Sequence, residues 1–159
     1  MAKDQVIKVG SIDVQITPFA FQHYAKDFYE AYKKHKSGPK FSPARLFLLT
    51  RSIELAAKSL HLKQGRTADD LRRVGHDLEA ACESGLLLAY GVSLSTSEET
   101  ELRKANDYYE RKGFEYFLFN LPGVPLDRSG PQLAGSGWPN LPDESVLEAL
   151  LNKLLSPSL

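Results

Sequence analysis

The sequence predicts an all-α protein, an up-and-down bundle of four to five helices. A short extended arm or hairpin precedes the bundle, and an irregular segment rich in Gly and Pro follows it. Three observations predict this class: apolar residues recur at helical spacing, capping signals precede these stretches, and Gly and Pro cluster outside them. The 159 residues suit a single domain spanning 1–159. We expect the arm over 1–17, the bundle over 18–120, and an irregular crossing segment with a short terminal helix over 121–159.

The composition is that of an ordinary globular domain. Twenty basic residues balance twenty acidic ones, so no overall charge draws the chain to nucleic acid or to a membrane. The single cysteine, Cys82, excludes an internal disulfide and a multi-cysteine metal site. No set of His, Asp and Glu has recognisable ligand spacing, and we expect neither a metal nor another cofactor. The chain starts without the apolar run of a signal peptide and has no membrane-spanning stretch, so we expect a cytoplasmic protein without membrane contact.

The first two helices are predicted by apolar periodicity. Residues 6–17 alternate loosely, as in a small hairpin or an extended arm. Pro18 then suits a first helical turn, and apolar residues at helical spacing predict a helix over about 19–36. The next helix, about 43–62, begins after Ser42, a good N-cap followed by proline. It is apolar on nearly all sides, which predicts a helix buried on several faces, the hub of the fold.

The middle of the chain carries two helix starts close together. Residues 67–70 resemble an N-terminal capping arrangement for a short turn or helix that Gly75 would end. Asp77 can then cap a third helix through about Tyr90. One unbroken helix over 68–90 is the alternative.

The last elements follow from similar signals. Ser95 to Glu98 forms a capping box that opens a fourth helix, ending near Gly113. The aromatic-rich residues 114–121 either continue that helix briefly or run extended, and 122–142 should be irregular. Asp143 or Ser145 caps a short final helix.

Two polar clusters stand out on this frame. Glu54 and Lys58 form an i,i+4 pair in the favourable orientation, and Arg51 projects on the same side. They form either a structural ion pair that orients the helix or a pocket for phosphate or nucleotide with Arg51 and Lys58 as donors. The second cluster consists of His76 and Asp77, a pair of residue types that also occurs in catalytic sites. The structural interpretation is that Asp77 accepts backbone N–H groups while His76 bonds to a neighbouring helix.

The order of these motifs resembles a known family. The stretch Ser52–Leu60, then Gly75–Leu78, then a tyrosine-rich fourth helix leading to Arg111 and Phe114–Phe117, is similar to the HEPN superfamily (higher eukaryotes and prokaryotes nucleotide-binding domain). The match is to its small, stand-alone bacterial members and covers about residues 18–119. The resemblance implies an up-and-down bundle that commonly dimerises. It also implies roles in toxin–antitoxin modules, RNA cleavage or partnership with minimal nucleotidyltransferases.

Many members of this superfamily are metal-independent ribonucleases with an arginine and a later histidine near the fourth helix, separated by four to six intervening residues. This chain departs from that pattern. In the expected region Arg103 is followed by Tyr108, and an unperturbed tyrosine, with a pKa of about 10, is a poor base. Arg72 precedes His76 by four positions, one short of the motif. These four residues are the only catalytic candidates.

The leading hypothesis is a non-catalytic, homodimeric helical-bundle module that binds RNA, a nucleotide or a partner protein through the polar residues. Its context would be a toxin–antitoxin system or a nucleotidyltransferase, so an antitoxin or a nucleotidyltransferase is the expected partner protein. One alternative is a divergent metal-independent ribonuclease or toxin that uses Arg72 with His76, or Arg103 with Tyr108. The other is a purely structural interaction subunit. The polar residues concerned are Arg51, Glu54, Lys58, His76 and Asp77.

Overall fold

The computed structural model describes residues 16–36, 42–114 and 140–157, and within these ranges the chain forms helices and turns without any strand. The all-α class is thereby confirmed. The helices are α1 (Pro18–Lys34), α2 (Pro43–Lys63), α3 (Ala68–Val74), α4 (Leu78–Ala81), α5 (Ser84–Ala89), α6 (Thr96–Tyr109) and α7 (Glu144–Leu155). None of these helices is long and apolar enough to cross a membrane.

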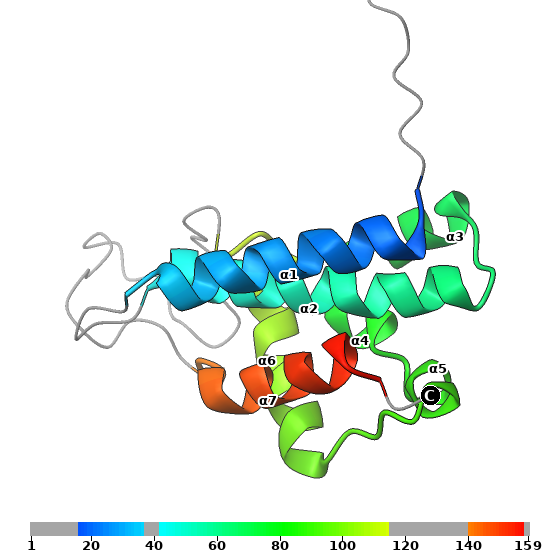
Figure 1. Ribbon diagram of the computed structural model, residues 1–159. Coiled ribbons are helices and arrows are strands. Elements are labelled where there is room, and N and C mark those ends of the chain that lie inside the picture. The colour runs from blue at the N-terminus through cyan, green and yellow to red at the C-terminus, as the bar shows by residue number, and fades with distance from the viewer. Residues whose placement is uncertain (1–15, 37–41, 115–139, 158–159) are drawn as a thin grey trace, which may run out of the picture.

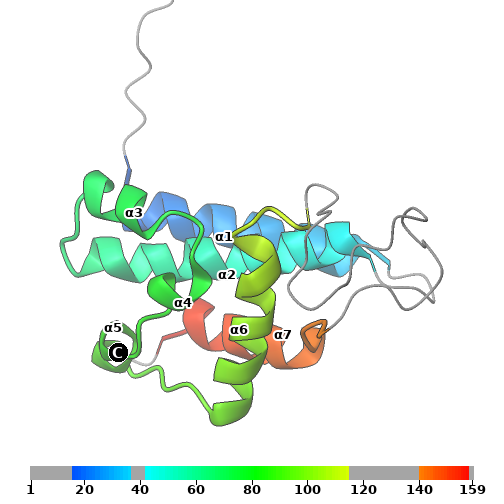
Figure 2. The same ribbon diagram turned by 180° about the vertical axis from the view of Figure 1, so that it is seen from behind.

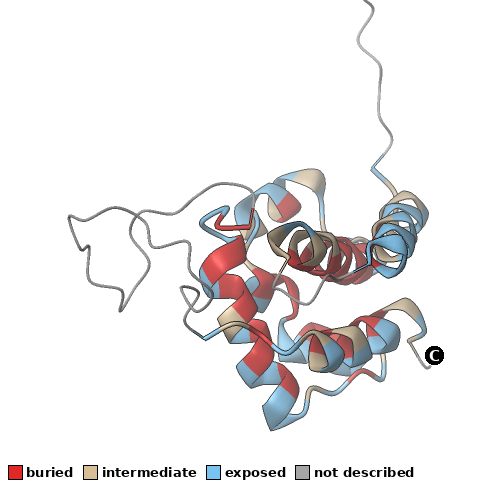
Figure 3. Cartoon of the chain, turned by 90° about the vertical axis from the view of Figure 1, so that its left-hand side faces the viewer, coloured by how far each residue is buried: buried red, intermediate tan, exposed pale blue. Residues whose placement is uncertain are grey.

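Helix α2 is the hub, as its all-round apolar pattern predicts. It lies beside α1 over most of its length and also contacts α4, α5, α6 and α7 (Figures 1 and 2). Its residues from Ser52 to His61 form one uninterrupted buried run, visible as the red helix near the centre of Figure 3. Helix α6 crosses α2 steeply in all three views instead of lying along it, so this part of the chain departs from up-and-down order.

The predicted helix starts are confirmed by their caps. Ser42 accepts a hydrogen bond from the Arg45 amide, and Pro43 lies in the first turn of α2. Complete capping boxes begin α3 and α6, in each of which the cap residue and the third helical residue bond to each other's backbone. The cap of α7 is Asp143 and not Ser145, because the Asp143 carboxylate accepts the first free amides of that helix.

The third predicted helix, from Asp77 to Tyr90, is wrong in its continuity. Asp77 does cap α4, but the chain leaves helical geometry at Cys82 and Glu83 before α5 begins. The break coincides with a contact with the hub: His61 Nε2 lies 2.8 Å from the Ala81 carbonyl oxygen. A carbonyl only accepts, so the ring donates, and it occupies an oxygen that a continuous helix would bond to the amide four residues later.

The alternative of one unbroken helix over 68–90 is also wrong. Gly75 ends α3 with φ 59° and ψ −129°, a left-handed conformation that glycine adopts without strain. The protein therefore has more and shorter helices than the four to five expected. The fourth predicted helix is confirmed but ends at Tyr109, and a turn carries the chain on to Phe114.

Several expectations fall on residues outside the described ranges. These are the arm up to residue 15, the aromatic segment after Phe114, and the irregular segment up to residue 139. The terminal helix that follows is confirmed as α7, whose apolar face of Leu147, Leu150, Leu151 and Leu154 is fully buried.

Candidate functional site

A buried carboxylate in the middle of α2 organises the candidate site. The side chain of Glu54 is only 1% exposed, and its two oxygens have separate partners. Oε1 lies 2.6 Å from Lys58 Nζ, and Oε2 lies 2.8 Å from Arg51 Nη1. Residues three before and four after a helical position lie on the same face, so the sequence alone predicts these two contacts.

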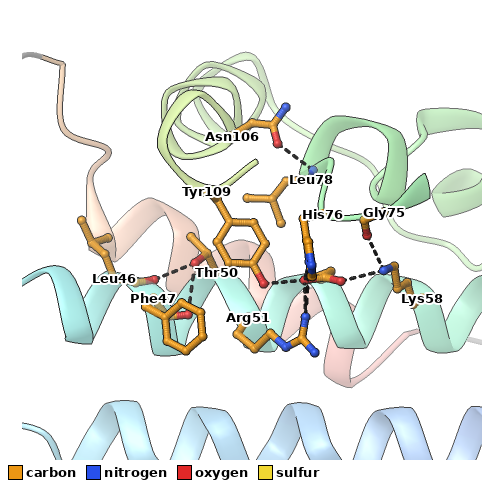
Figure 4. A network of polar contacts seen from close by, with 11 residues as sticks. Leu46, Phe47, Thr50, Arg51, Lys58, Gly75, His76, Leu78, Asn106 and Tyr109 are labelled. Carbon is orange, nitrogen blue, oxygen red and sulfur yellow. Dashed lines mark hydrogen bonds and ion pairs between the residues drawn. The ribbon is translucent and has the colours of Figure 1, made fainter. Parts of the chain in front are cut away.

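Two further residues reach the same carboxylate from other parts of the chain (Figure 4). His76, in the turn between α3 and α4, places Nδ1 3.3 Å from Glu54 Oε2. Tyr109, the last residue of α6, donates its hydroxyl hydrogen to the same oxygen. Lys58 also donates to the Gly75 carbonyl. We refer to Arg51, Glu54, Lys58, His76 and Tyr109 as the Glu54 cluster; it joins α2, α6 and the α3–α4 turn.

The charges of this cluster are fixed by their surroundings. Burial opposes ionisation of Glu54, but the Arg51 charge and the hydrogen bonds from Lys58 and Tyr109 outweigh it and hold the pKa of the carboxyl below its usual range. Burial, together with the neighbouring carboxylate, raises the pKa of Tyr109, so the phenol stays protonated and donates. One carboxylate thus lies between two cations, and the cluster is net positive with His76 neutral.

The cluster reaches the surface at one side. The side chain of His76 is 46% exposed and that of Arg51 29%, whereas Lys58 is 9% exposed. His76 and Lys58 also line an open depression of about 340 Å³. Phe21 and Leu71 contribute apolar wall to it, and Arg72 contributes a second cation. The surface therefore offers basic groups beside an apolar wall.

Asp77, predicted with His76, belongs to a different set of contacts. Its Oδ1 accepts from the Ala80 amide at 3.0 Å and from Asn106 Nδ2 at 3.1 Å. Asn106 in turn accepts from the buried Leu78 amide at 2.7 Å. Asp77 is therefore a helix cap that also holds α6 to α4. The structural interpretation of Asp77 fits these contacts.

The remaining catalytic candidates are divided between two places. Arg72 pairs with Asp69 at 2.5 Å on the surface and shares the depression with His76. Arg103 pairs with the exposed Glu79 at 3.1 Å, while the Tyr108 ring is buried and stacks on Phe114 with centroids 5.4 Å apart.

Burial raises the pKa of Tyr108 further, so near neutral pH its phenol stays protonated and yields almost no phenolate to act as a base. Within the described ranges, no three His, Cys, Asp or Glu side chains are grouped as metal ligands would be.

A separate set of polar contacts lies at the C-terminal end of α1. Arg45 Nε contacts Glu144 Oε2 at 2.6 Å, and its Nη1 donates to the Tyr32 and His35 carbonyls at 2.9 and 2.7 Å. Its guanidinium also lies over the Tyr32 ring, 3.9 Å from the centroid. These contacts close the C-terminal end of α1 and attach α7 to it, a structural role.

Sequence reasoning missed two members of these networks. Tyr109 falls within the predicted fourth helix, but the carboxylate that accepts its hydroxyl hydrogen lies in α2, 55 positions away. Nothing in the sequence pattern predicted that Asn106, in the same helix, would be buried.

No protein-family model, curated protein or solved structure matches this chain. Fold and site together define a helical protein with a buried, cation-paired carboxylate, two of whose partners, His76 and Lys58, line a surface depression together with Arg72 and apolar side chains.

Proposed function

We propose that this protein is a non-catalytic binding module for a phosphate-bearing ligand, an RNA or a nucleotide, and that Arg51 and His76 contact the phosphate. The observation that carries the proposal is the anchoring of both side chains on one buried carboxylate while both stay partly exposed. A net positive cluster at the surface is chemically matched to an oxyanion.

The donors of Arg51 support this role. Its hydrogen bond to Glu54 at 2.8 Å and its contact with His76 at 3.5 Å both use Nη1, and the Tyr109 hydroxyl also interacts with the guanidinium. A guanidinium has five N–H donors, so these three neighbours do not use all of them and donors remain for a ligand. Lys58 has a different task, because its ammonium is buried between Glu54 and the Gly75 carbonyl.

Anchoring also lowers the cost of binding. A free arginine side chain loses rotamer entropy when it is fixed on a ligand, at about 0.5–1.5 kcal/mol. Glu54 already restrains Arg51, and Tyr109 restrains the His76 ring, whose centroid lies 6.0 Å from the tyrosine ring at an edge-on angle. The site is therefore preorganised.

The test is titration of the purified protein with short RNA and with nucleotides, beside an Arg51→Gln variant. Loss of a charge-assisted hydrogen bond of about 1.5–3 kcal/mol should weaken binding roughly 10- to 100-fold. Arg103→Gln is the matched control, since this arginine also pairs with a glutamate, Glu79, but lies on the surface outside the Glu54 cluster. Equal loss in both variants would indicate nonspecific charge attraction. Absence of RNA and nucleotide binding would refute the proposal, and a protein partner would then have to be sought.

The finer architecture is part of the same proposal: a HEPN-type bundle that forms a homodimer beside an antitoxin or a nucleotidyltransferase. The order of the sequence motifs supports the type. The exposed aromatic side chains of Phe19 (79%) and Tyr24 (56%) on α1 support a dimer face. Light scattering after gel filtration should give twice the 17.7 kDa chain mass, and a Phe19→Ser, Tyr24→Ser variant should be monomeric. A wild-type monomer would refute the dimer alone.

One observation favours a second function, a divergent metal-independent ribonuclease. Arg72 and His76 line the same depression, so a phosphate held there would lie near an imidazole that can transfer a proton. Expression of the wild type beside His76→Ala and Arg103→Ala, with RNA integrity and growth as readouts, separates the functions. Cleavage that is lost in His76→Ala and kept in Arg103→Ala would favour the ribonuclease. Intact RNA with the wild type would remove it.

A further inference from the structure

His76 Nδ1 lies between two groups with opposite demands. Glu54 Oε2 is 3.3 Å away and only accepts hydrogen bonds, whereas Arg51 Nη1 is 3.5 Å away and only donates them. A protonated Nδ1 bonds to the carboxylate, and a bare Nδ1 bonds to the guanidinium. The nitrogen therefore satisfies one neighbour at a time.

The charge of the Glu54 carboxylate determines which of the two neighbours His76 Nδ1 bonds to. Glu54 stays ionised because of its cationic neighbours, and Arg51 already has this carboxylate as its acceptor. A bare Nδ1 would face the negative oxygen with its lone pair, so the neutral ring carries its hydrogen on Nδ1. Nε2 then bears the lone pair. The contacts of His76 with the described residues all use Nδ1, and its exposed side chain lines the depression.

We propose that His76 couples proton uptake to the binding of an oxyanion in this depression. Protonation places a hydrogen on Nε2 and a positive charge on the ring, which converts a hydrogen-bond acceptor facing the ligand into a charged donor. This inference rests on the proposed function and adds its regulation: RNA or another phosphate ligand binds more tightly at a pH low enough for the imidazole to be protonated.

The charged groups around His76 show why the ligand matters. The cations of Arg51 and Lys58 on α2 and of Arg72 on α3 oppose a further positive charge, and Glu54 favours it. The charge of Arg72 is partly offset by its pair with Asp69. The Tyr109 phenol on α6 is neutral, and α1 contributes the apolar Phe21. The adjacent Asp77 carboxylate is engaged by the Ala80 amide and by Asn106.

A bound oxyanion would offset these cations and stabilise the protonated ring. By thermodynamic reciprocity, an anion that raises the proton affinity of His76 by some factor is itself bound more tightly by that factor when the ring is protonated. Coupling between two binding events commonly amounts to about 5- to 150-fold, and we expect about tenfold for this half-exposed side chain.

The first experiment follows the ring protons of the wild-type histidines by NMR from about pH 5 to pH 8, in sulfate and in chloride of equal ionic strength. The charge of sulfate does not change over this range. The titration midpoint of His76 should rise by about one pH unit in sulfate, the equivalent of tenfold. His23, exposed on α1 and 3.6 Å from Asp27, is the internal control and should not respond. An equal response of both rings would overturn the proposal.

The second experiment measures the affinity for short RNA at about pH 6 and pH 8. The wild type should bind about tenfold more tightly at the lower pH. His76→Asn keeps an N–H opposite Glu54 but cannot titrate, and its affinity should be the same at both values.

The outcomes separate the two proposals. The coupling is refuted if the wild type binds RNA equally well at both pH values. It is also refuted if sulfate binds without changing the His76 titration midpoint. Either result leaves the proposed function standing. If neither sulfate nor RNA binds at either pH, both proposals fall. The NMR measurement needs no variant, so misfolding of His76→Asn would not remove the test.

Discussion

Replacement of Glu54 by glutamine is the sharpest test of the Glu54 cluster. Glutamine has nearly the same shape but one acceptor oxygen in place of two, and it carries no charge. The carboxylate receives Lys58 on Oε1, and Arg51, His76 and Tyr109 on Oε2. The amide nitrogen must face one of these two sets of donors. Its less costly position is opposite the single donor Lys58.

The magnitude follows from the burial of that lysine. In Glu54→Gln the Lys58 ammonium, 9% exposed, would face an NH₂ group and keep only the Gly75 carbonyl. Removing one partner of a buried ion pair costs about 3–5 kcal/mol. Arg51 is 29% exposed and regains hydration, so we expect the lower part of this range, about 3–4 kcal/mol. At about 2–4 °C per kcal/mol for a chain of this size, the melting temperature should fall by roughly 10 °C.

The assay is urea unfolding followed by circular dichroism at equal protein concentration. Glu54→Gln with Lys58→Met removes both charges and should recover a large part of the lost stability, since a neutral pair leaves no buried charge unpaired. Asp69→Asn is the control, because the side chains of Asp69 and its partner Arg72 are 72% and 78% exposed, and such a pair should contribute less than about 1 kcal/mol. A loss below about 1 kcal/mol in Glu54→Gln, or a double variant worse than the single one, would refute the reasoning.

Three further outcomes follow from the same contacts. Tyr109→Phe keeps the ring packing but loses the hydroxyl bond to Glu54, and should lower the free energy of unfolding by about 1–2 kcal/mol in urea. Because the pKa of Glu54 is lower in the folded chain, its contribution to stability is present above its usual value of 4.5. That contribution is lost as the pH falls below this value, so the urea midpoint should depend less on pH in Glu54→Gln than in the wild type. Burial raises the pKa of Cys82 to about 12, so iodoacetamide should label it only after unfolding; labelling of the native protein, read by mass spectrometry, would contradict its placement in the core.

Most helix boundaries were predictable because caps are local. Ser42, Asp77 and Ser95 act within three residues of themselves, and this information lies in the sequence. The break at Cys82 was not predictable, because neither it nor Glu83 is a helix breaker. It coincides with a bond between His61 and the Ala81 carbonyl across 20 positions, which exists only once α2 is in place.

The candidate site divides in the same way. Arg51, Glu54 and Lys58 meet because helical geometry brings positions three and four apart onto one face. The approach of His76 depends on the left-handed turn at Gly75, and that of Tyr109 on the steep crossing of α6 over α2 (Figures 2 and 4). These are tertiary facts. Sequence patterns could place Tyr109 in the fourth helix but could not identify its partner.

Because one carboxylate serves both stability and the exposed basic groups, the two properties should change together. A ligand that binds only the folded chain stabilises it in proportion to the logarithm of its concentration over its dissociation constant. In Glu54→Gln with Lys58→Met, a neutral amide oxygen replaces the carboxylate that anchors the guanidinium of Arg51 and the ring of His76, so both RNA affinity and RNA-induced stabilisation should fall. A purely structural subunit predicts the contrary: altered stability with no binding to lose. The double variant, measured with and without RNA, therefore decides whether the Glu54 cluster only holds three elements together or also presents them to a ligand.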